Sequence, residues 1–518
     1  MTVATRAVGP GDASRSAVET RARTVQAFAG GELDLLVLGG GIVGAGVARD
    51  AALRGLRVGL VEQHDFAYGT SSRSSRLLHG GIRYLAQGRL GLVREASREK
   101  KILQRIAPHL VQPMPFLFPT YRENRNWVLW QLKVGVKLYD FLCGGRNFEA
   151  SSWLGRSEVQ GRIPGLRSDG LEGAVRYFDG FTNDARLVLD TLRSAAGAGA
   201  LVLNYCRFID GRREKLWRCR LKDEHAGVEL EVGARAVVNA TGPWAETVPH
   251  SRVKLRLTKG VHLIVDRRRF GIGETIVMTQ GKRILFAIPW GDRTVLGTTD
   301  TDFRDKPENV RPTVEDVEEV LAVVNRFFPQ LGLGAGDLLG AWAGLRPLIA
   351  DPHGKPSDIS RSHEIREAEP FWWDVAGGKL TTYRLMGEQT VDRVLRRLGR
   401  WTTCRTAEEP LLGNGAVEGV SGLIPPGFSP GLVEHYCANE WALHLEDVLI
   451  RRSGWYYYDR NRAAAVAEES GRLMAGVLGW SEELRETEMA AWRRRVDEDA
   501  LAVARDREDR GPARVASL

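Results

Sequence analysis

Residues 33–62 read LDLLVLGGGIVGAGVARDAALRGLRVGLVE. The apolar run 33–38 has the length of a strand, and the glycine-rich turn after it leads into a helical pattern from Ala45 to Arg54. Gly55 then ends the helix, and a second apolar run reaches Glu62. This order of strand, turn, helix and strand predicts a complete βαβ unit.

The glycines of this turn have the spacing of a dinucleotide-binding fingerprint. Gly39 allows a sharp turn out of the strand, Gly41 lets the backbone approach a pyrophosphate, and Gly44 lets the helix pack closely on the sheet. Free N–H groups at the helix N-terminus then favour a phosphate, and the Glu62 carboxylate is placed to accept the hydroxyls of an adenosine ribose. The spacing alone is weak evidence for such a site in a chain with 58 glycines. The flanking strand, helix and acid together predict a dinucleotide site.

Two later segments favour FAD over NAD as the dinucleotide. Residues 234–242, ARAVVNATG, have the pattern of a buried strand that ends in the small-residue turn Ala240, Thr241 and Gly242, as in the second nucleotide-contacting strand of flavoproteins. Residues 372–384, WWDVAGGKLTTYR, combine a strand, a glycine turn and a helix start. In flavoproteins such a helix N-terminus faces the isoalloxazine. An ordinary strand-to-helix turn is the alternative. The predicted cofactor contacts in this second segment are Gly378, Lys379, Leu380 and Thr381.

Composition places the chain among globular proteins that favour anionic partners. Hydrophobic residues make up 43% and charged residues 27% of its 518 residues, which is enough for more than one domain with a large core. The formal net charge of +8 favours phosphorylated small molecules or acidic lipid headgroups. Nucleic acid is disfavoured because zinc-finger spacing, RNP-like motifs and basic runs with interleaved aromatics are absent. The five cysteines contain no CxxC pair, so we expect no metal site.

The two ends of the chain differ from its middle. Residues 1–31 have no helical or strand periodicity and no apolar stretch of signal-peptide length, so we expect a mobile leader and a cytoplasmic protein. Strand-like runs alternate with helical patterns over residues 32–405, which predicts mixed α/β architecture. Residues 406–518 are charged and helical in period, which predicts a C-terminal helical domain. No window is apolar and long enough for a transmembrane helix, so any membrane contact is expected to be peripheral.

From Asp34 to about Arg405 the chain resembles the membrane-associated, FAD-dependent (aerobic) glycerol-3-phosphate dehydrogenases. The resemblance rests on ten blocks in the family's order, GGGIVGAGVARDAALRG, TSSRSSRLLHGGIRYL, APHLVQPMPF, NDARLVLD, VVNATGPW, KGVHLIV, AIPW, GTTD, AGLRPL and GGKLTTYR. It implies an FAD-binding Rossmann-like domain of the glutathione-reductase or amino-acid-oxidase type. A β-sheet substrate domain, formed by residues of about 111–180 and 255–345, would be interleaved with it. The implied reaction is oxidation of sn-glycerol 3-phosphate to dihydroxyacetone phosphate, with hydride transfer from C2 to flavin N5 and electrons passed to a membrane quinone.

The resemblance also implies roles for single residues. FAD is expected to contact Thr70, Ser71 and Ser72. A small dianion needs several converging cations, and the substrate pocket is expected to contain Arg83, Tyr84, Thr299, Arg346 and Lys379, although any one of the 73 Lys and Arg residues is by default a solvated surface charge. We expect His262 to act as general base and Arg346 to stabilise the developing alkoxide. A packed core histidine is the alternative for His262.

Other functions stay open at this point. A glycerol-3-phosphate oxidase would deliver the electrons to O₂, a non-catalytic binding module would only hold FAD, and an NAD dehydrogenase would lack flavin. Residues 126–140, NWVLWQLKVGVKLYD, have two tryptophans, two lysines and a largely apolar face. Such a helix suits peripheral binding to the anionic inner face of the cell membrane, and a core helix is the alternative. The resemblance also leaves a homodimer open.

Overall fold

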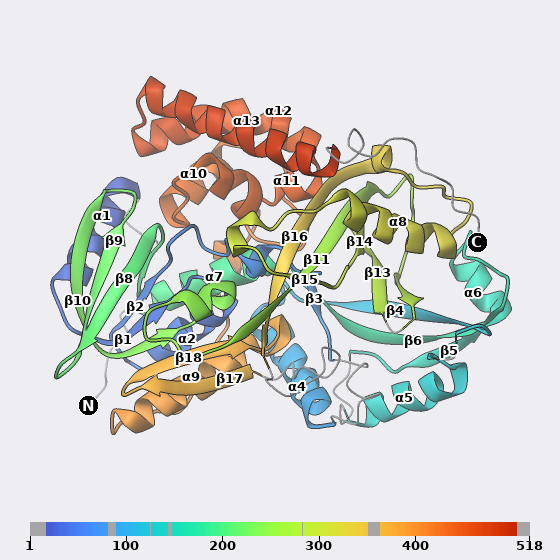
Figure 1. Ribbon diagram of the computed structural model, residues 1–518, viewed down its shortest axis with the longest axis horizontal. Helices are drawn as coiled ribbons and strands as arrows, with labels where there is room; N and C mark the ends of the chain where they lie inside the picture. The colour runs from blue at the N-terminus through green and yellow to red at the C-terminus, as the bar shows by residue number, and fades with distance from the viewer. Residues whose placement is uncertain are drawn as a thin grey trace.

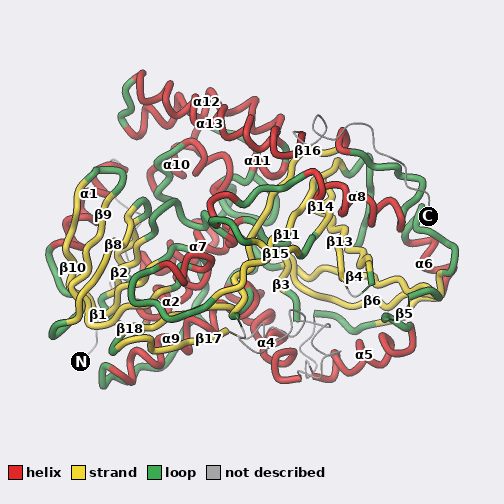
Figure 2. Tube along the Cα trace, in the orientation of Figure 1, coloured by secondary structure: helices red, strands yellow, loops and turns green. Residues whose placement is uncertain are grey.

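Two β-sheets lie side by side, and the C-terminal helices form a layer along one edge of both (Figure 1). The computed structural model describes residues 17–80, 90–124, 126–142, 148–281, 283–350 and 363–504. Figure 2 shows the strands gathered into two groups with helices around and between them. No helix of this described part is both long and apolar enough to cross a membrane.

The first sheet contains the predicted βαβ unit. In the described residues it has eight strands, in the order β17-β18-β10-β1-β2-β7, and β8 and β9 extend β10 as an antiparallel pair. The pairs β10–β1, β1–β2, β2–β7 and β10–β18 are parallel. The strands are β1 Leu33–Leu38, β2 Val58–Val61, β7 Leu201–Leu203, β8 Cys206–Arg213, β9 Trp217–Asp223, β10 Val228–Asn239, β17 His363–Glu369 and β18 Trp372–Gly377.

Strand β1 is apolar along nearly its whole length because both faces of this sheet are covered. Leu35 and Val37 pack on the layer formed by α2, α7 and α9, whereas Leu36 and Leu38 pack with Phe28 of α1 and with β8 and β9 on the opposite face. Alternate side chains of a strand point to opposite faces, so a centrally placed parallel strand needs apolar residues at every position. The helices of this part are α1 Ala17–Ala29, α2 Ile42–Leu53, α4 Leu90–Ile106, α7 Asp184–Gly197 and α9 Tyr383–Arg397.

The second sheet is mostly antiparallel. Its ten strands in the described residues run in the order β15-β11-β14-β13-β12-β4-β6-β3, with β16 paired to β11 and β5 paired to β6. They are β3 Leu77–Leu78, β4 Gln112–Tyr121, β5 Ser152–Gly155, β6 Leu171–Phe181, β11 Leu255–Asp266, β12 Thr275–Gln280, β13 Arg283–Trp290, β14 Arg293–Gly297, β15 Thr301–Phe303 and β16 Leu338–Ile349. The helices beside it are α5 Leu129–Leu142, α6 Arg156–Arg162 and α8 Val314–Phe327.

The C-terminal helices cover one face of this second sheet. Trp290 and Trp342 of the sheet share a core with Tyr436, Leu449 and other residues of the C-terminal part, and α8 covers the opposite face. The elements are α10 Pro430–Asn439, the π-helical segment η8 Asp447–Arg452, α11 Trp455–Tyr458, α12 Arg460–Leu478 and α13 Glu482–Ala504. The short 3₁₀ helices are η1 Thr70–Ser72, η2 Gly242–Thr247, η3 Pro307–Asn309, η4 Ala335–Asp337, η6 Leu380–Thr382 and η7 Asn414–Ala416.

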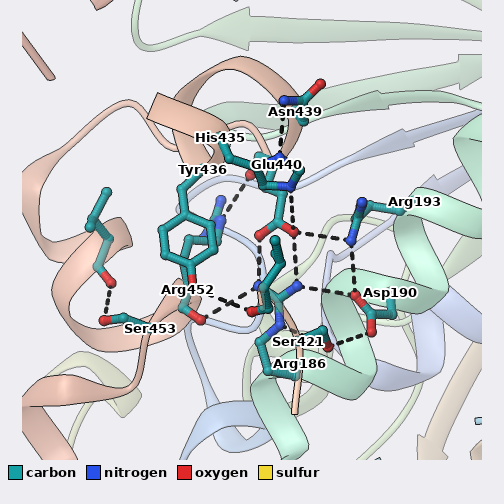
Figure 3. A network of polar contacts seen from close by, with 12 residues as sticks. Arg186, Asp190, Arg193, Ser421, His435, Tyr436, Asn439, Glu440, Arg452 and Ser453 are labelled. Carbon is teal, nitrogen blue, oxygen red and sulfur yellow. Dashed lines mark hydrogen bonds and ion pairs between the residues drawn. The ribbon is translucent and has the colours of Figure 1, made fainter. Parts of the chain in front are cut away.

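A buried polar network joins the C-terminal part to α7, a helix that covers the first sheet (Figure 3). Nη1 and Nη2 of Arg186 on α7 donate to the two carboxylate oxygens of Glu440, at 2.6 and 2.8 Å. Asp65, which lies just after β2, is bound in the same way by Arg452 of η8. These charges are out of water, so each needs its partner to stay buried.

The predicted mobile leader is wrong for residues 17–29, which form helix α1. Nη2 of Arg21 lies 2.8 Å from a carboxylate oxygen of Asp223, and Nη1 donates to Asn204. Phe28 is fully buried against the first sheet. The helix depends on these tertiary contacts rather than on its own apolar periodicity, which is why the sequence pattern missed it. Residues 1–16 lie outside the described residues.

Candidate functional site

A cavity of about 470 Å³ lies at the carboxyl ends of β1, β2, β10 and β18. Strand β1 pairs with β2 on one side and with β10 on the other, so the strand order reverses at β1. Open α/β sheets bind ligands at such a reversal. Most of the predicted cofactor residues line it, namely Gly39, Gly41, Glu62, Thr70, Ser71, Ala240, Thr241, Gly242, Gly378, Lys379 and Leu380.

The glycine turn after β1 has the geometry that the fingerprint predicts. Gly39 has φ +106°, and a Cβ at this position would lie 2.6 Å from the carbonyl oxygen of Ala240. A Cβ at Gly44 would collide with the carbonyl oxygen of Gly39. Gly44 does not line the cavity, and its absent side chain instead lets α2 start close to the turn. The N–H groups of α2 are thereby aimed at the cavity.

Glu62 stands at the end of β2 with its carboxylate toward the same turn. Its two oxygens accept hydrogen bonds from the backbone N–H of Gly40 at 2.7 Å and of His64 at 2.9 Å. Burial raises the pKa of this carboxyl, and the two N–H donors act in the opposite direction. The carboxylate is therefore fixed in position while its residue still lines the cavity.

The polar segment after β2 is ordered rather than a loose loop. Thr70 donates from Oγ1 to the carbonyl of Leu345 at 2.6 Å, and Ser71 accepts from the N–H of Ile42 at 3.0 Å. Ser72 Oγ is buried and has no hydrogen-bond partner among the described residues. Ser72 does not line the cavity, so its predicted cofactor contact remains a prediction.

The turn after β18 forms the opposite end of the cavity. Gly377 and Gly378 both have positive φ, at +71° and +80°, and a Cβ at Gly378 would clash with the side chain of Met386. The turn brings Lys379 and Leu380 to the cavity wall at the start of η6. Thr381 is buried, and its hydroxyl donates to the carbonyl of His79 at 3.3 Å, away from the lining residues.

These residues fit a bound FAD. The cavity is bounded by a turn without side chains at the N-terminus of α2, by the carboxylate of Glu62 and by a second glycine turn ahead of α9. Backbone N–H groups at such turns suit a pyrophosphate.

His262 lies on β11, in the second sheet, and is almost fully buried. Its Nε2 is 2.8 Å from Ser75 Oγ, and its ring stacks on Trp342 with centroids 5.2 Å apart. Nδ1 is buried without a hydrogen-bond partner in the described part of the chain. Burial, with the nearby positive charges of Arg346 and Arg76, lowers the pKa of the imidazole to about 3. The ring is therefore neutral at physiological pH.

Arg346 stands on β16 opposite Thr258 of β11, whereas the residue opposite His262 is Trp342. The guanidinium of Arg346 lies beside Gly260, two residues from His262 on the same strand. Its Nη1 lies 3.2 Å from Asp300, and its Nη2 donates to Thr298 Oγ1 at 3.1 Å. The predicted substrate contact Thr299 is buried, and its hydroxyl accepts from the N–H of Val261 at 3.0 Å. The Thr299 hydroxyl is thus already engaged by backbone.

The predicted substrate residues Arg83 and Tyr84 lie outside the described residues. Two residues that the sequence did not single out, Ser75 and Trp342, contact His262 directly. Ser75 belongs to the same polar block as Ser71 and Ser72, so position in that block was the available signal. Trp342 is four residues before Arg346 on β16 and had no recognisable signal of its own.

The chain matches two family models. The FAD dependent oxidoreductase model matches residues 34–393, and the model for the C-terminal domain of alpha-glycerophosphate oxidase matches residues 428–485. Among known proteins, the chain is 34% identical to a glycerol-3-phosphate dehydrogenase of Mycobacterium leprae, over 95% of this chain and 93% of that protein. It is 37% identical to an aerobic glycerol-3-phosphate dehydrogenase of Staphylococcus aureus, over 71% of this chain and 68% of that protein.

Solved structures agree with this similarity. The glycerol-3-phosphate dehydrogenase from Bacillus halodurans complexed with FAD superposes with a TM-score of 0.74 at 28% identity, over 94% of this chain and 98% of that one. An L-alpha-glycerophosphate oxidase from Mycoplasma pneumoniae with FAD bound has a TM-score of 0.58 at 18% identity, over 72% of this chain and 96% of that one. This second likeness shows a shared fold.

Proposed function

The chain belongs to the FAD dependent oxidoreductases and, within them, to the glycerol-3-phosphate dehydrogenases, and from this we propose that it oxidises sn-glycerol 3-phosphate to dihydroxyacetone phosphate with FAD. The observation that carries the proposal is the similarity to a glycerol-3-phosphate dehydrogenase over 95% of the chain. The cavity at the strand ends supports it, because it combines a pyrophosphate turn with a second glycine turn that presents Lys379.

FAD, when bound, supplies the acceptor for the hydride that leaves C2 of the substrate. The glycine turn at Gly39 and Gly41 and the Glu62 carboxylate would hold its nucleotide half. The turn at Gly378 to Leu380, which precedes α9, would lie beside its ring, where a helix N-terminus favours negative charge.

We propose that His262 accepts the proton of the C2 hydroxyl. Its imidazole has one ring nitrogen without a partner in the described residues, as a proton acceptor requires. Arg346 lies on the neighbouring strand, where its fixed positive charge would stabilise an alkoxide. Lys379, Arg346, Thr299 and, outside the described residues, Arg83 and Tyr84 are proposed to hold the phosphate and hydroxyls.

Anaerobic titration with glycerol 3-phosphate tests the function directly. The purified protein should be yellow, and its visible flavin absorbance should bleach with one substrate per flavin. Glycerol, which lacks the phosphate, is the matched control and should bleach the flavin far more slowly. A yellow protein that glycerol 3-phosphate leaves oxidised would be a non-catalytic FAD-holding module, and a colourless one would be consistent with NAD.

A membrane quinone is the proposed electron acceptor, and O₂ is the second candidate. The oxidase is favoured by one observation, the match of residues 428–485 to the C-terminal domain of alpha-glycerophosphate oxidase. Rapid mixing of the reduced protein with each acceptor separates the two. Fast reoxidation by a quinone with slow reaction toward O₂ supports the dehydrogenase, and fast reoxidation by O₂ with one peroxide per flavin overturns it.

The proposed location is the inner face of the cell membrane, to which the protein would bind peripherally. The net charge of +8 supports attraction to anionic lipid, since each Lys or Arg near such a surface contributes on the order of 1 kcal/mol. Sedimentation of lysed cells in low and high salt tests this. A protein that stays in the supernatant at low salt would not be membrane-bound.

A further inference from the structure

Helix α5 is apolar on two opposite sides. On its inner side Leu132, Val136 and Tyr139 are buried in the protein core. On its outer side four side chains at near-helical spacing face solvent, Trp130 (64% exposed), Val134 (61%), Leu138 (39%) and Phe141 (77%). The sequence left a core helix and an interfacial helix as alternatives, and α5 has one side that suits each of them. An apolar outer side on a surface helix indicates that something covers it.

Trp153 of the neighbouring strand β5 extends this apolar outer side. It is 54% exposed, and the ammonium groups of Lys133 and Lys137 lie 5.4 and 5.8 Å from its ring centroid. Lys137 also donates to the carbonyl of Ser151 at 2.7 Å, which ties β5 to α5. The α5 patch, defined as Trp130, Val134, Leu138, Phe141 and Trp153, is thus a preformed surface with two cations within it.

Helix α4 packs against α5 and presents positive charge to solvent. Its exposed side carries basic residues four, three and four positions apart, Arg94, Arg98, Lys101 and Arg105. Arg94, Arg98 and Arg105 are exposed and Lys101 is half-buried. Nη2 of Arg105 also donates to the carbonyl of Ala407 at 2.7 Å. Both helices run along the same lower edge of the molecule in Figure 1, opposite the C-terminal helices.

The size and charge of this face favour a lipid surface over a second copy of the chain. The three aromatic side chains of the α5 patch together expose on the order of 400 Å², since such a side chain carries roughly 150–250 Å². A stable dimer needs about 800 Å² per partner. A symmetric dimer through this face would also bring the basic residues of two α4 helices together. Aromatic residues flanked by Lys and Arg are instead what an anionic membrane interface favours.

Helix α4 also connects this face to the cofactor cavity. Helix α4 packs on η6, the turn that carries Leu380 to the cavity wall, and Glu99 of α4 holds Arg384 at the start of α9 by two hydrogen bonds of 2.7 Å. Contact of α4 with a bilayer would therefore bring the second glycine turn of the cofactor cavity toward the lipid phase.

We propose that the α4–α5 face docks on an anionic phospholipid surface, with the α5 patch inserted at the headgroup level and Arg94, Arg98 and Arg105 against lipid phosphates. This rests on the proposed peripheral location and names the surface responsible for it. The attachment combines apolar insertion with charge attraction, so it is reversible and weakens as salt screens the arginines.

Co-sedimentation of the holoprotein with vesicles tests the proposal. Vesicles of an equal mixture of phosphatidylcholine and phosphatidylglycerol should bind it, and vesicles of phosphatidylcholine alone should bind it at least about tenfold more weakly. The variants are Trp130→Glu with Phe141→Glu, and Arg94→Glu with Arg98→Glu. Each should lower binding to the mixed vesicles at least about tenfold. Flavin reduction by glycerol 3-phosphate in solution should stay within about twofold of wild type, because neither pair lies in the cavity.

Matched controls lie on the opposite edge of the molecule. Leu484→Glu on α13, which is 42% exposed in the parent, and Arg472→Glu with Arg493→Glu on α12 and α13 should leave vesicle binding unchanged. Equal losses in the controls and the α4–α5 variants would reduce the effect to net charge and overturn the proposal. Wild type could also prove to be a dimer that the Trp130 and Phe141 changes make monomeric without affecting vesicle binding. That result would assign the face to contact with a second copy of the chain. Failure of wild type to bind mixed vesicles would overturn the docking, while anaerobic flavin bleaching tests the reaction independently.

Discussion

Ser75 Oγ lies 2.8 Å from Nε2 of His262, and this contact leaves Nδ1 as the ring nitrogen without a partner in the described residues. If the Nε2–H donates to Ser75, Nδ1 carries the lone pair that a general base needs. Stacking on Trp342 fixes the plane of the ring. Ser75 would then act as a positioning residue, which works through His262 rather than on the substrate.

The first prediction concerns these two residues. His262→Ala should slow single-turnover flavin reduction by roughly two to four orders of magnitude with normal FAD content, which is the usual value of a positioned base. Ser75→Ala should slow it by less, about tenfold, and leave substrate KM nearly unchanged, because only the ring orientation is lost. Stopped-flow absorbance measures both. If His262→Ala slows flavin reduction by less than about tenfold, His262 is a packing residue and not the base.

The lowered pKa of His262 predicts an acid-sensitive fold. Its folded pKa of about 3 lies below the unfolded value of 6.5, so between these values the unfolded chain binds a proton that the folded chain does not. The stabilisation is therefore fully present above pH 6.5 and is lost as the pH falls, with a slope of up to about 1.4 kcal/mol per pH unit. Urea midpoints of wild type and His262→Asn, measured from neutral pH to about pH 5, should converge on acidification. Parallel curves would contradict the prediction.

Lys379 should bind substrate rather than FAD. It lines the cavity at the second glycine turn, where an ammonium group can make a charge-assisted contact to phosphate. Lys379→Ala should raise the KM for glycerol 3-phosphate by roughly tenfold to a hundredfold, corresponding to a loss of about 1.5–3 kcal/mol, at nearly wild-type flavin content. Lys215→Ala, on an exposed turn between β8 and β9, is the control. Loss of flavin in the Lys379 variant with an unchanged KM would show that this lysine binds the cofactor and not the substrate.

Glu62 should determine how tightly FAD is held. Its carboxylate is fixed by the N–H groups of Gly40 and His64, so Glu62→Gln keeps the shape but removes the charge that accepts the ribose hydroxyls. The variant should purify with less flavin and regain activity when FAD is added. Its FAD dissociation constant, from fluorescence titration, should rise by about tenfold or more. Full flavin occupancy after extensive dialysis would contradict the assignment of Glu62 to the ribose.

The sequence predicted the parts of this protein that are encoded locally. The βαβ unit was confirmed because its strand, glycine turn, helix and acid are all contained in residues 33–62. The flavoprotein fold and the family were confirmed by the comparisons. Helix α1 and Ser75 were missed because their significance comes from residues far along the chain, Asp223 and His262. The lowered pKa of His262 likewise needs the fold that brings Arg346 and Arg76 near it. The assignments of the substrate residues remain predictions.

The last prediction concerns the buried pair of Arg186 and Glu440, which are 254 residues apart in sequence and both nearly inaccessible to water. Neutralising one partner leaves the other charged group buried and only partly compensated, here by Asp190 at 3.1 Å from Arg186. Glu440→Gln should therefore cost about 3–5 kcal/mol of stability and expose the junction around residues 440–452 to proteases. Arg186→Met combined with Glu440→Gln should recover part of this loss, because no uncompensated arginine remains at that position.

Glu468→Gln removes an exposed carboxylate that pairs with Arg485, and its cost should stay below about 1 kcal/mol. Thermal unfolding and limited proteolysis of the four proteins measure these effects. Equal small losses for Glu440→Gln and Glu468→Gln would mean that the C-terminal domain is held by its apolar contacts and not by this pair.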